Sequence, residues 1–396
     1  MPKYIRTESP TGRVGEVYSW ASVIDEGTIE QATRLSRSYA VVGHVALMPD
    51  AHVGNGATIG SVVKTAASII PAAVGVDIGC GVIAARVDIK ADDLNEQALK
   101  RTYAEIRKAI PAGMGGAHEK PIGLWEDFEF FNPVPGRVRK DAALYQRAAK
   151  QFGTLGDGNH FVELAKDGLN NVWVIIHSGS RGVGNLLAEE SQTVARNQCE
   201  ADGYKLEDPN LSWLVAGTTE FNTYIEHMLW AQRYAYNQRV AMLHHAVQAL
   251  GPGVVIHELY NCHHNYAENI DGDTWLTRKG AINASKGQYG LIPGSMATGT
   301  FLVRGLGNEL SYNSAPHGAG RLLSRGMARR QLNEKVFKQE MEGILWQDRN
   351  SAELLDEAPS AYKPINTVMN DASDLVEPVA FFTQIANYKG TTRKKR

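Results

Sequence analysis

The stretch that most constrains the fold is AAVGVDIGCGV, residues 72–82, which leads into a long apolar run. We predict a strand within residues 74–89, because valine, isoleucine and alanine dominate them and β-branched residues favour strands. Asp77 and Cys80 stand three residues apart at a glycine-rich turn of this stretch, so a carboxylate and a thiol can face one centre. Pro71, Asp77 and several glycines exclude a membrane span over residues 66–87.

Other apolar runs alternate irregularly with longer amphipathic segments. We predict further strands at residues 161–165, 172–177, 254–259 and 301–303. We predict helices at residues 94–110, 138–152, 185–200 and 220–250. The longest helix should present to the core the residues Ile225, Leu229, Tyr236, Val240, Leu243, Val247 and Leu250. No regular βαβ alternation and no long linker is present, so we expect an α+β fold of mixed sheets packed with helices, in one domain over residues 1–396.

The composition shows an excess of glycine and a charge near zero. Glycine makes up 39 of 396 residues, against an average of about 7%. The net charge of −2 excludes a chain that coats nucleic acid through overall charge. Three widely spaced cysteines indicate a reducing compartment rather than a disulfide framework. Because the first residues contain no apolar signal segment, we expect a cytoplasmic protein without a membrane partner.

Six segments combine glycine with residue types that bind metals or phosphates. They are MPDAHVGNGATIG (48–60), GVDIGCG (75–81), GTLGDGNHFVEL (153–164), HSGSRGVGN (177–185), NCHHNYAE (261–268), and the pair PGSMATGT (293–300) and APHGAGR (315–321). Glycine allows a backbone to approach a ligand closely or to adopt a positive φ. We therefore expect these segments to line a ligand site.

One group of side chains within these segments offers oxygen, sulfur and nitrogen donors. Its members are Asp77, Cys80, His160, His177 and His264. Taken singly, Asp77 could be a turn cap, Cys80 a small buried residue and each histidine a structural one. Jointly they form a plausible site for one or two transition metals, and donor softness suggests zinc, cobalt or iron. His263 competes with His264 for the last position.

A second group surrounds His317, which is followed by Gly318, Ala319 and Gly320. We predict a helix that starts near Arg321, so its N-terminus could hold phosphate. Arg321, Arg325 and Arg329 would form one basic stripe on that helix, along which a phosphodiester backbone could lie. His317 could then be a metal ligand, an acid–base group or a nucleophile. The basic run at residues 391–396 is interpreted as a solvated end rather than an RNA contact.

Seven blocks, in order and over nearly the whole chain, resemble the RtcB family of RNA-splicing and RNA-repair ligases: MPDAHVGNGATIG, AAVGVDIGCGV, GTLGDGNHFVEL, HSGSRGVGN, CHHN, GLIPGSM and HGAGR. The resemblance implies a GTP- and Mn²⁺-dependent ligase that acts in RNA repair or tRNA splicing. Such an enzyme joins a 2′,3′-cyclic phosphate or 3′-phosphate RNA end to a 5′-hydroxyl end, through a guanylylated histidine and an RNA-3′-pp-5′-G intermediate.

The resemblance also implies roles for individual residues. Cys80 would bridge two Mn²⁺ ions, with Asp77 and His160 on one ion and His177 and His264 on the other. His317 would be the nucleophile. The nucleotide pocket would comprise Asn159, His160, Phe161, Val162, Glu163, His264, Asn265, Pro293, Gly294, Ser295, Met296, Thr300, His317, Gly318, Ala319, Gly320 and Lys389. By our own inference, Arg321 and Arg325 steer the RNA backbone.

The sequence departs from the usual family pattern near the proposed pocket, at Asp157, Thr300 and the pair Ala315-Pro316. None of these positions is a predicted metal ligand or the predicted nucleophile. We therefore expect the departures to affect substrate preference and the rate of ligation. The alternative function is a metal-dependent cyclic phosphodiesterase that opens RNA ends without ligation. A second alternative is a scaffold that binds RNA ends without catalysis. Against it, every predicted metal ligand and the predicted nucleophile is a residue type that can perform its role. We expect a monomer.

Overall fold

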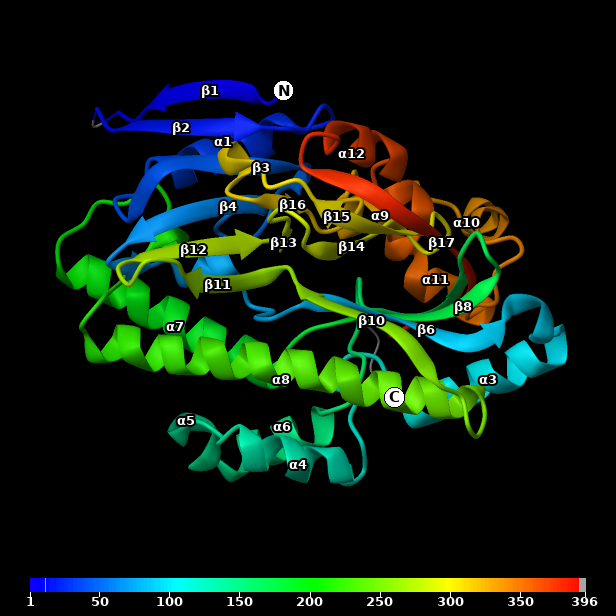
Figure 1. Cartoon of the computed structure of the whole chain (residues 1–396). Helices are drawn as coiled ribbons and strands as arrows, with labels where there is room; N and C mark the ends of the chain where they lie inside the picture. Colours follow the sequence, from blue (N-terminus) through cyan, green and yellow to red (C-terminus); the bar gives the residue numbers. More distant parts are fainter. Residues whose placement is uncertain (11, 392–396) are drawn as a thin grey trace.

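Two sheets built mainly from antiparallel strands form the centre of the protein (Figure 1). The computed structural model describes residues 1–10 and 12–391. The six-stranded sheet has the order β1 (Lys3–Glu8), β2 (Val14–Ser19), β3 (Val41–His52), β4 (Ile59–Ala66), β12 (Thr274–Lys279), β11 (Asn265–Asn269). The seven-stranded sheet has the order β10 (Ile256–His263), β6 (Gly81–Lys90), β8 (Asn171–Ser178), β7 (Phe161–Lys166), β17 (Val376–Lys389), β15 (Thr300–Gly305), β14 (Tyr289–Pro293).

Two further strand pairs are short. They are β13 (Ala281–Asn283) with β16 (Ser314–Pro316), and β5 (Ser68–Ile69) with β9 (Leu214–Val215). Strands β2 and β3 form a parallel pair, whereas the two neighbours of β6 in its sheet are antiparallel to it. The start of β6 therefore lies beside the ends of β8 and β10.

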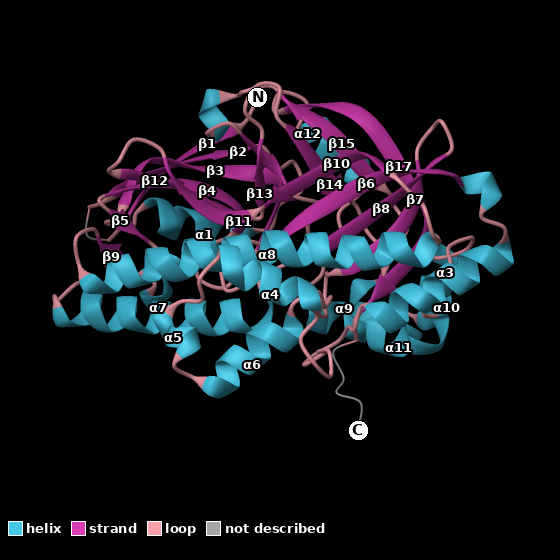
Figure 2. Ribbon diagram, turned by 60° about the horizontal axis from the view of Figure 1, so that its bottom comes forward, coloured by secondary structure: helices cyan, strands magenta, loops and turns pink. Residues whose placement is uncertain are grey.

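Long helices cover one side of the sheets, as Figure 2 shows, with α7 and α8 below the strands and α4, α5 and α6 beyond them. The helices are α1 (Glu26–Ser36), α2 (Pro71–Val74), α3 (Glu96–Ala109), α4 (Gly123–Phe131), α5 (Gly136–Arg139), α6 (Ala142–Gln151), α7 (Arg181–Ala201), α8 (Thr219–Leu250), α9 (Arg325–Gln331), α10 (Glu334–Glu340), α11 (Ser351–Leu354) and α12 (Ile365–Asp371). This mixture of sheets and helices confirms the α+β class. No helix among the described residues has the length and apolarity of a membrane span.

The core explains why β6 is apolar along most of its length. Ile83 and Val87 pack on one face of the sheet against residues of α3 and α8. Val82 and Ala84 pack on the other face, with Phe382 of β17. Because both faces are buried, a continuous apolar run is favoured over an alternating one.

Several predicted elements are confirmed with shifted bounds. Helices α3 and α8 lie where predicted, and the side chains of Asn95 and Thr218 accept hydrogen bonds at their N-termini. The predicted strand over residues 74–89 is wrong at its start, because residues 71–74 form α2 and β6 begins only at Gly81. The predicted helix over residues 138–152 is interrupted, and Asp141 caps α6 as a separate helix.

The predicted core face of α8 is wrong in part. Leu243 and Leu250 are buried, but Leu229, Tyr236 and Val240 are exposed. Large buried residues of this helix include instead Phe221, Tyr224, Met228, Trp230 and Tyr234. The aromatic residues form a core with α4 and α6, and this packing rotates the buried face away from the aliphatic stripe.

Candidate metal centre and active site

The predicted metal ligands meet at one edge of the seven-stranded sheet. Cys80 directly precedes β6, His160 directly precedes β7, and His177 lies near the end of β8. His264 follows β10, the other neighbour of β6. Since antiparallel neighbours run in opposite directions, the starts of β6 and β7 and the ends of β8 and β10 share this edge.

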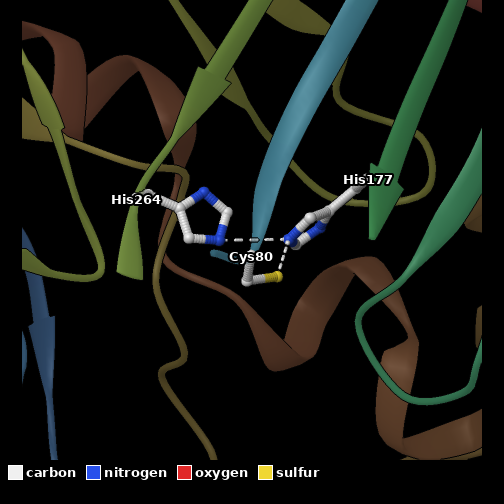
Figure 3. Close-up of side chains that lie close together, drawn as sticks. All are labelled: Cys80, His177 and His264. Carbon is white, nitrogen blue, oxygen red and sulfur yellow. Dashed lines mark hydrogen bonds between the residues drawn. The ribbon is translucent and has the colours of Figure 1, made fainter. Parts of the chain in front are cut away.

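The ligand atoms form two groups that share one sulfur. Cys80 Sγ lies 3.2 Å from His177 Nε2, which lies 3.3 Å from His264 Nε2 (Figure 3). The same sulfur lies 3.4 Å from His160 Nε2, and Asp77 Oδ2 lies 2.9 Å from that nitrogen. Within each group, Cys80–His177–His264 and Asp77–Cys80–His160, all donor atoms are within 4.8 Å of one another. The five residues are therefore brought together as two candidate metal sites.

The neighbouring histidine is used differently. His263 Nδ1 lies 2.7 Å from the carbonyl oxygen of Gly79 and 3.3 Å from Arg239 Nη2. The structure thus places His264, rather than His263, in the cluster. His263 instead bonds to the backbone beside Cys80.

The arrangement of donors fits metal cations. His160 Nδ1 lies 3.0 Å from the carbonyl oxygen of Leu155, and its Nε2 faces Asp77 Oδ2. A cation between Nε2 and Oδ2 would be held by both atoms. Burial lowers the pKa of His177 and His264 well below the usual value, so both rings are neutral and have a free lone pair.

The charge state of the sulfur depends on a cation. Burial, reinforced by the charge of Asp77, raises the pKa of the Cys80 thiol well above its usual value. A bound metal ion reverses this preference and deprotonates a coordinating thiol. For Asp77, burial would raise the carboxyl pKa, but the hydrogen bond and charge of His160 outweigh it and hold the pKa low.

Asp77 is also positioned by the start of α7. The backbone N–H of Ser180 donates to Asp77 Oδ1 at 3.0 Å. A Cβ on Gly179 would lie 2.0 Å from the same oxygen, so position 179 requires glycine. The HSGS segment therefore supplies both His177 and a close backbone contact to Asp77.

His317 follows β16 and lies next to the candidate metal donors, with its ring centroid 4.7 Å from that of His264. Its Nδ1 lies 2.6 Å from Oδ2 of the fully buried Asp50. The backbone N–H groups of His317 and Gly318 donate to the same oxygen at 3.0 and 3.2 Å. Gly320 has φ +69°, and a Cβ there would lie 2.1 Å from the Asp50 carbonyl oxygen. The glycines after His317 thus allow two segments to pack closely.

A pocket of about 820 Å³ opens over His317 and the cluster. Of the residues predicted for the nucleotide, its lining includes Asn159, Phe161, His264, Asn265, Pro293, Gly294, Ser295, Met296, His317, Gly318, Ala319, Gly320 and Lys389. In the described part of the chain, that lining does not include the buried residues His160, Val162, Glu163 and Thr300. Val162 packs in the core behind the sheet.

Glu163 is a buried carboxyl group beneath the pocket. Its Oε1 accepts hydrogen bonds from Gln384 at 3.2 Å and Asn387 at 2.6 Å, and Gln384 also donates to the backbone of Ser295. Burial raises its pKa to about 8, although Gln384, Lys389 and Asn387 act in the opposite direction. Oε2 is buried and has no hydrogen-bond partner in the described structure.

The predicted basic stripe has a different geometry from the one expected. Helix α9 starts at Arg325, with Ser324 as its N-cap, whereas Arg321 forms an isolated bridge with Tyr362 before the helix. The prediction of a helix, and of a phosphate site at its N-terminus, directly after Gly320 is therefore wrong. The extended backbone carries Arg321 to Tyr362 instead.

Two buried carboxylates gather the arginines at the pocket rim. Glu357 pairs with Arg325, with Arg321 at 3.4 Å, and with Lys389 at 3.0 Å. Asp356 pairs with Arg325 at 2.8 Å. Burial would raise the pKa of Glu357, but these three cations outweigh burial and hold that pKa far below its usual value. Residues 392–396 of the basic tail lie outside the described residues, so their interpretation stays a prediction.

The sequence analysis did not identify Asp50, Glu357 or Arg239. Of these three residues, only Asp50 could have been found from the sequence, because it lies inside the glycine-rich segment 48–60. Glu357 and Arg239 occur in ordinary helical or polar contexts. Only their burial, at 1% and 0% exposure, distinguishes them from solvated charges.

Comparison with known proteins bears on the same residues. The family model described as "tRNA-splicing ligase RtcB" matches residues 31–131 and 126–390. The chain belongs to the RtcB family. It is 39% identical over 389 residues to the RNA-splicing ligase RtcB of Escherichia coli (strain K12), covering 91% of this chain and 93% of that protein. It is 29% identical to the tRNA-splicing ligase RtcB of Nanoarchaeum equitans, covering 92% of each.

The family match confirms the resemblance drawn from the seven blocks. It spans every RtcB block quoted above, from residue 48 to residue 321, and also includes Glu357 and Lys389. The tRNA-splicing ligase RtcB of Pyrobaculum aerophilum is 29% identical over 423 residues, with 87% of each chain covered.

Proposed function

We propose that this chain is a GTP- and Mn²⁺-dependent RNA ligase, acting in RNA repair or tRNA splicing. It joins an RNA 2′,3′-cyclic phosphate or 3′-phosphate end to a 5′-hydroxyl end. The observation that carries this proposal is a histidine, His317, in one pocket with a thiol, Cys80, that two groups of metal donors share. Membership of the RtcB family, and relatives named as RNA-splicing ligases, support the same reaction class.

The donor groups would hold two Mn²⁺ ions per chain. Cys80 would bridge them, with Asp77 and His160 on one side and His177 and His264 on the other. When bound, the ions supply positive charge that neutralises phosphate oxygens and makes phosphorus more electrophilic. The protein's own contribution is to present these donors from one sheet edge, already gathered.

His317 is the nucleophile of the first step. With Nδ1 against Asp50, the Nε2 lone pair attacks the α-phosphorus of GTP. A nitrogen–phosphorus bond forms, the bond to the bridging oxygen breaks, and pyrophosphate leaves. Asp50 compensates the positive charge that develops on the imidazole.

When the RNA end is a cyclic phosphate, water first opens it to the 3′-phosphate. Two further displacements then complete the joining. An oxygen of that 3′-phosphate then attacks the phosphorus on His317, breaking the nitrogen–phosphorus bond and forming an RNA-3′-pp-5′-G anhydride. Finally the 5′-hydroxyl attacks the RNA phosphorus, and GMP leaves. Each displacement has a better leaving group than direct joining of a 3′-phosphate would have.

Glu163 and the pocket residues would select the nucleotide. Once the carboxyl group of Glu163 is ionised, its unpartnered Oε2 suits the N–H donors on the edge of guanine. Ser295, Asn387 and Lys389 line the pocket next to it.

We further propose that residues 1–396 form one catalytic domain that works in the cytoplasm.

Arg321 and Arg325 would guide the RNA. With Lys389 they bring three positive charges to the two carboxylates of Glu357 and Asp356, so the pocket rim keeps an excess of positive charge for phosphodiesters. R321A and R325A should weaken RNA joining and leave guanylylation of the protein intact. Equal loss of both steps would assign these arginines to the nucleotide or the fold.

The test is covalent labelling of the protein without RNA. Incubation with α-labelled GTP and Mn²⁺ should leave an acid-labile label on the wild-type chain. H317A should gain no label and still bind Mn²⁺, whereas H257A, at an exposed histidine of β10, should be labelled normally. An unlabelled wild-type chain with confirmed metal content would exclude the ligase mechanism and favour the cyclic phosphodiesterase.

A further inference from the structure

Arg239 of α8 is a fully buried arginine that reaches three separate segments at the candidate metal centre. Its Nη1 donates to the carbonyl oxygens of Gly79 at 2.9 Å and Ser178 at 2.8 Å. Its Nε donates to Oδ1 of Asn261 at 2.9 Å. One planar side chain therefore links a turn and two strands that are far apart in sequence.

Each of these acceptors stands close to a metal donor in the chain. Gly79 precedes Cys80, and Ser178 follows His177. Asn261 lies on β10, which leads to His264. One guanidinium group thereby bonds to the segments that carry three of the five donors.

The surroundings are built to admit this side chain. A Cβ on Gly81 would lie 2.1 Å from the carbonyl oxygen of Cys262 and 3.0 Å from Arg239 Nη2, so the glycine leaves room for both β10 and the guanidinium. The preceding residue, Gln238, donates to Ser178 Oγ at 2.7 Å and to the Gly179 carbonyl at 2.6 Å. Two consecutive residues of a 32-residue helix thus bond to the segment that carries His177.

The charge of Arg239 argues for a role beyond stability. Within residues 1–10 and 12–391, no carboxylate lies in ion-pair contact with Arg239. Burying a cation without such a partner is costly, and the same charge repels metal ions. This cost is offset if the planar guanidinium group, with its several N–H donors, holds the three segments in a geometry that a neutral side chain cannot.

We propose that Arg239 is a positioning residue of the metal centre, holding the segments of Cys80, His177 and His264 in the arrangement that binds metal. This inference rests on the metal centre proposed above. Without the fork, each segment moves independently, and binding must bring the donors together at an entropic cost. Arg239 acts through two backbone carbonyls and the side chain of Asn261, and it belongs to neither donor group.

The test measures Mn²⁺ binding alone, with no GTP or RNA present. R239M should weaken Mn²⁺ affinity by about 10- to 100-fold, the usual effect of losing a group that orients metal ligands. R239K keeps the charge but replaces a planar fork by one ammonium, so its affinity should remain low. Free Mn²⁺ is followed by its paramagnetic resonance signal, and folding by circular dichroism in chelator.

Y234F provides a matched control on the same helix. Tyr234 is fully buried, and its hydroxyl donates to the carbonyl of Ala148 at 2.8 Å, away from the donor segments. Y234F should lower the melting temperature and leave Mn²⁺ affinity unchanged. A parallel loss of affinity in Y234F would mean that metal binding only follows stability, and would overturn the proposal.

Two other outcomes overturn it. Normal affinity in folded R239M removes the positioning role, and full affinity in R239K shows that charge rather than the fork matters. If R239M does not fold, R239K and N261A, which removes the half-buried acceptor of Nε, must both weaken binding. A wild-type chain that binds no Mn²⁺ contradicts the proposed function instead, so the two failures are distinguishable.

Discussion

Asp50 Oδ2 lies 2.6 Å from His317 Nδ1, and the backbone N–H groups of His317 and Gly318 donate to that oxygen. Lys363 secures the carboxylate by donating to the carbonyl oxygens of Pro49 and Ala51. A segment near the amino end therefore sets the orientation of a histidine 267 residues away. The contact leaves Nε2 as the ring nitrogen available for chemistry.

D50N should slow guanylylation of His317 by about 100-fold or more, because misplacing a reacting group by 1 Å has an effect of that size. Rapid-quench labelling with α-labelled GTP measures the rate. Mn²⁺ affinity should be unchanged, since Asp50 belongs to neither donor group. D88N, at an exposed residue of β6, serves as control. An unaltered labelling rate in D50N would remove Asp50 from the mechanism.

C80A should lose the capacity for two Mn²⁺ ions per chain, because both donor groups share this sulfur. Metal analysis of the chain after equilibration with Mn²⁺ and gel filtration measures the stoichiometry. C199A is the matched control, since Cys199 is also buried but contacts the backbone of Trp213. Two ions retained in C80A would refute a bridging sulfur.

Wild-type stability should decrease relative to E163Q between about pH 4.5 and 8. Burial raises the Glu163 pKa from 4.5 to about 8, so in this range the folded state holds a proton that the unfolded state has released. Unfolding then becomes easier as pH rises. Urea unfolding at pH 5, 6.5 and 8 tests this difference. A constant gap between the two proteins would mean that Glu163 does not titrate in this range.

E357A should lower the free energy of unfolding by about 3–5 kcal/mol, because it leaves buried cations without their carboxylate. The most buried of these cations is Lys389, 3.0 Å away. Urea unfolding at pH 7 gives the value. E258A, which removes a partly exposed ion pair with Arg86, should change stability by only about 0.2–1 kcal/mol.

The same carboxylate predicts an acid dependence. The Glu357 pKa is held well below its ordinary value of 4.5, so its stabilising contribution is complete above that pH and declines as pH falls further. The stability difference between wild type and E357A should therefore narrow in acid. A difference that stays constant down to pH 3 would contradict the low pKa.

The sequence by itself identified the donor types and the segments that carry them. Asp77, Cys80 and His317 could be selected because glycine-rich turns and metal-binding residues are local features of a chain. Helix α8 was also predictable, since its 3.6-residue periodicity is a local feature, as are the residues Gly251-Pro252-Gly253 that follow it. Its buried face was not, because aromatic packing against α4 and α6 decided the rotation.

Tertiary structure alone decided which polar groups are paired inside the protein. Asp50 meets His317, Arg239 meets the segments of Cys80 and His177, and Glu357 collects cations of the pocket rim. A charged residue has the same local pattern whether it is solvated or buried. Its energy differs because desolvation must be offset by partners, and strand pairing and helix packing bring those partners from distant parts of the chain.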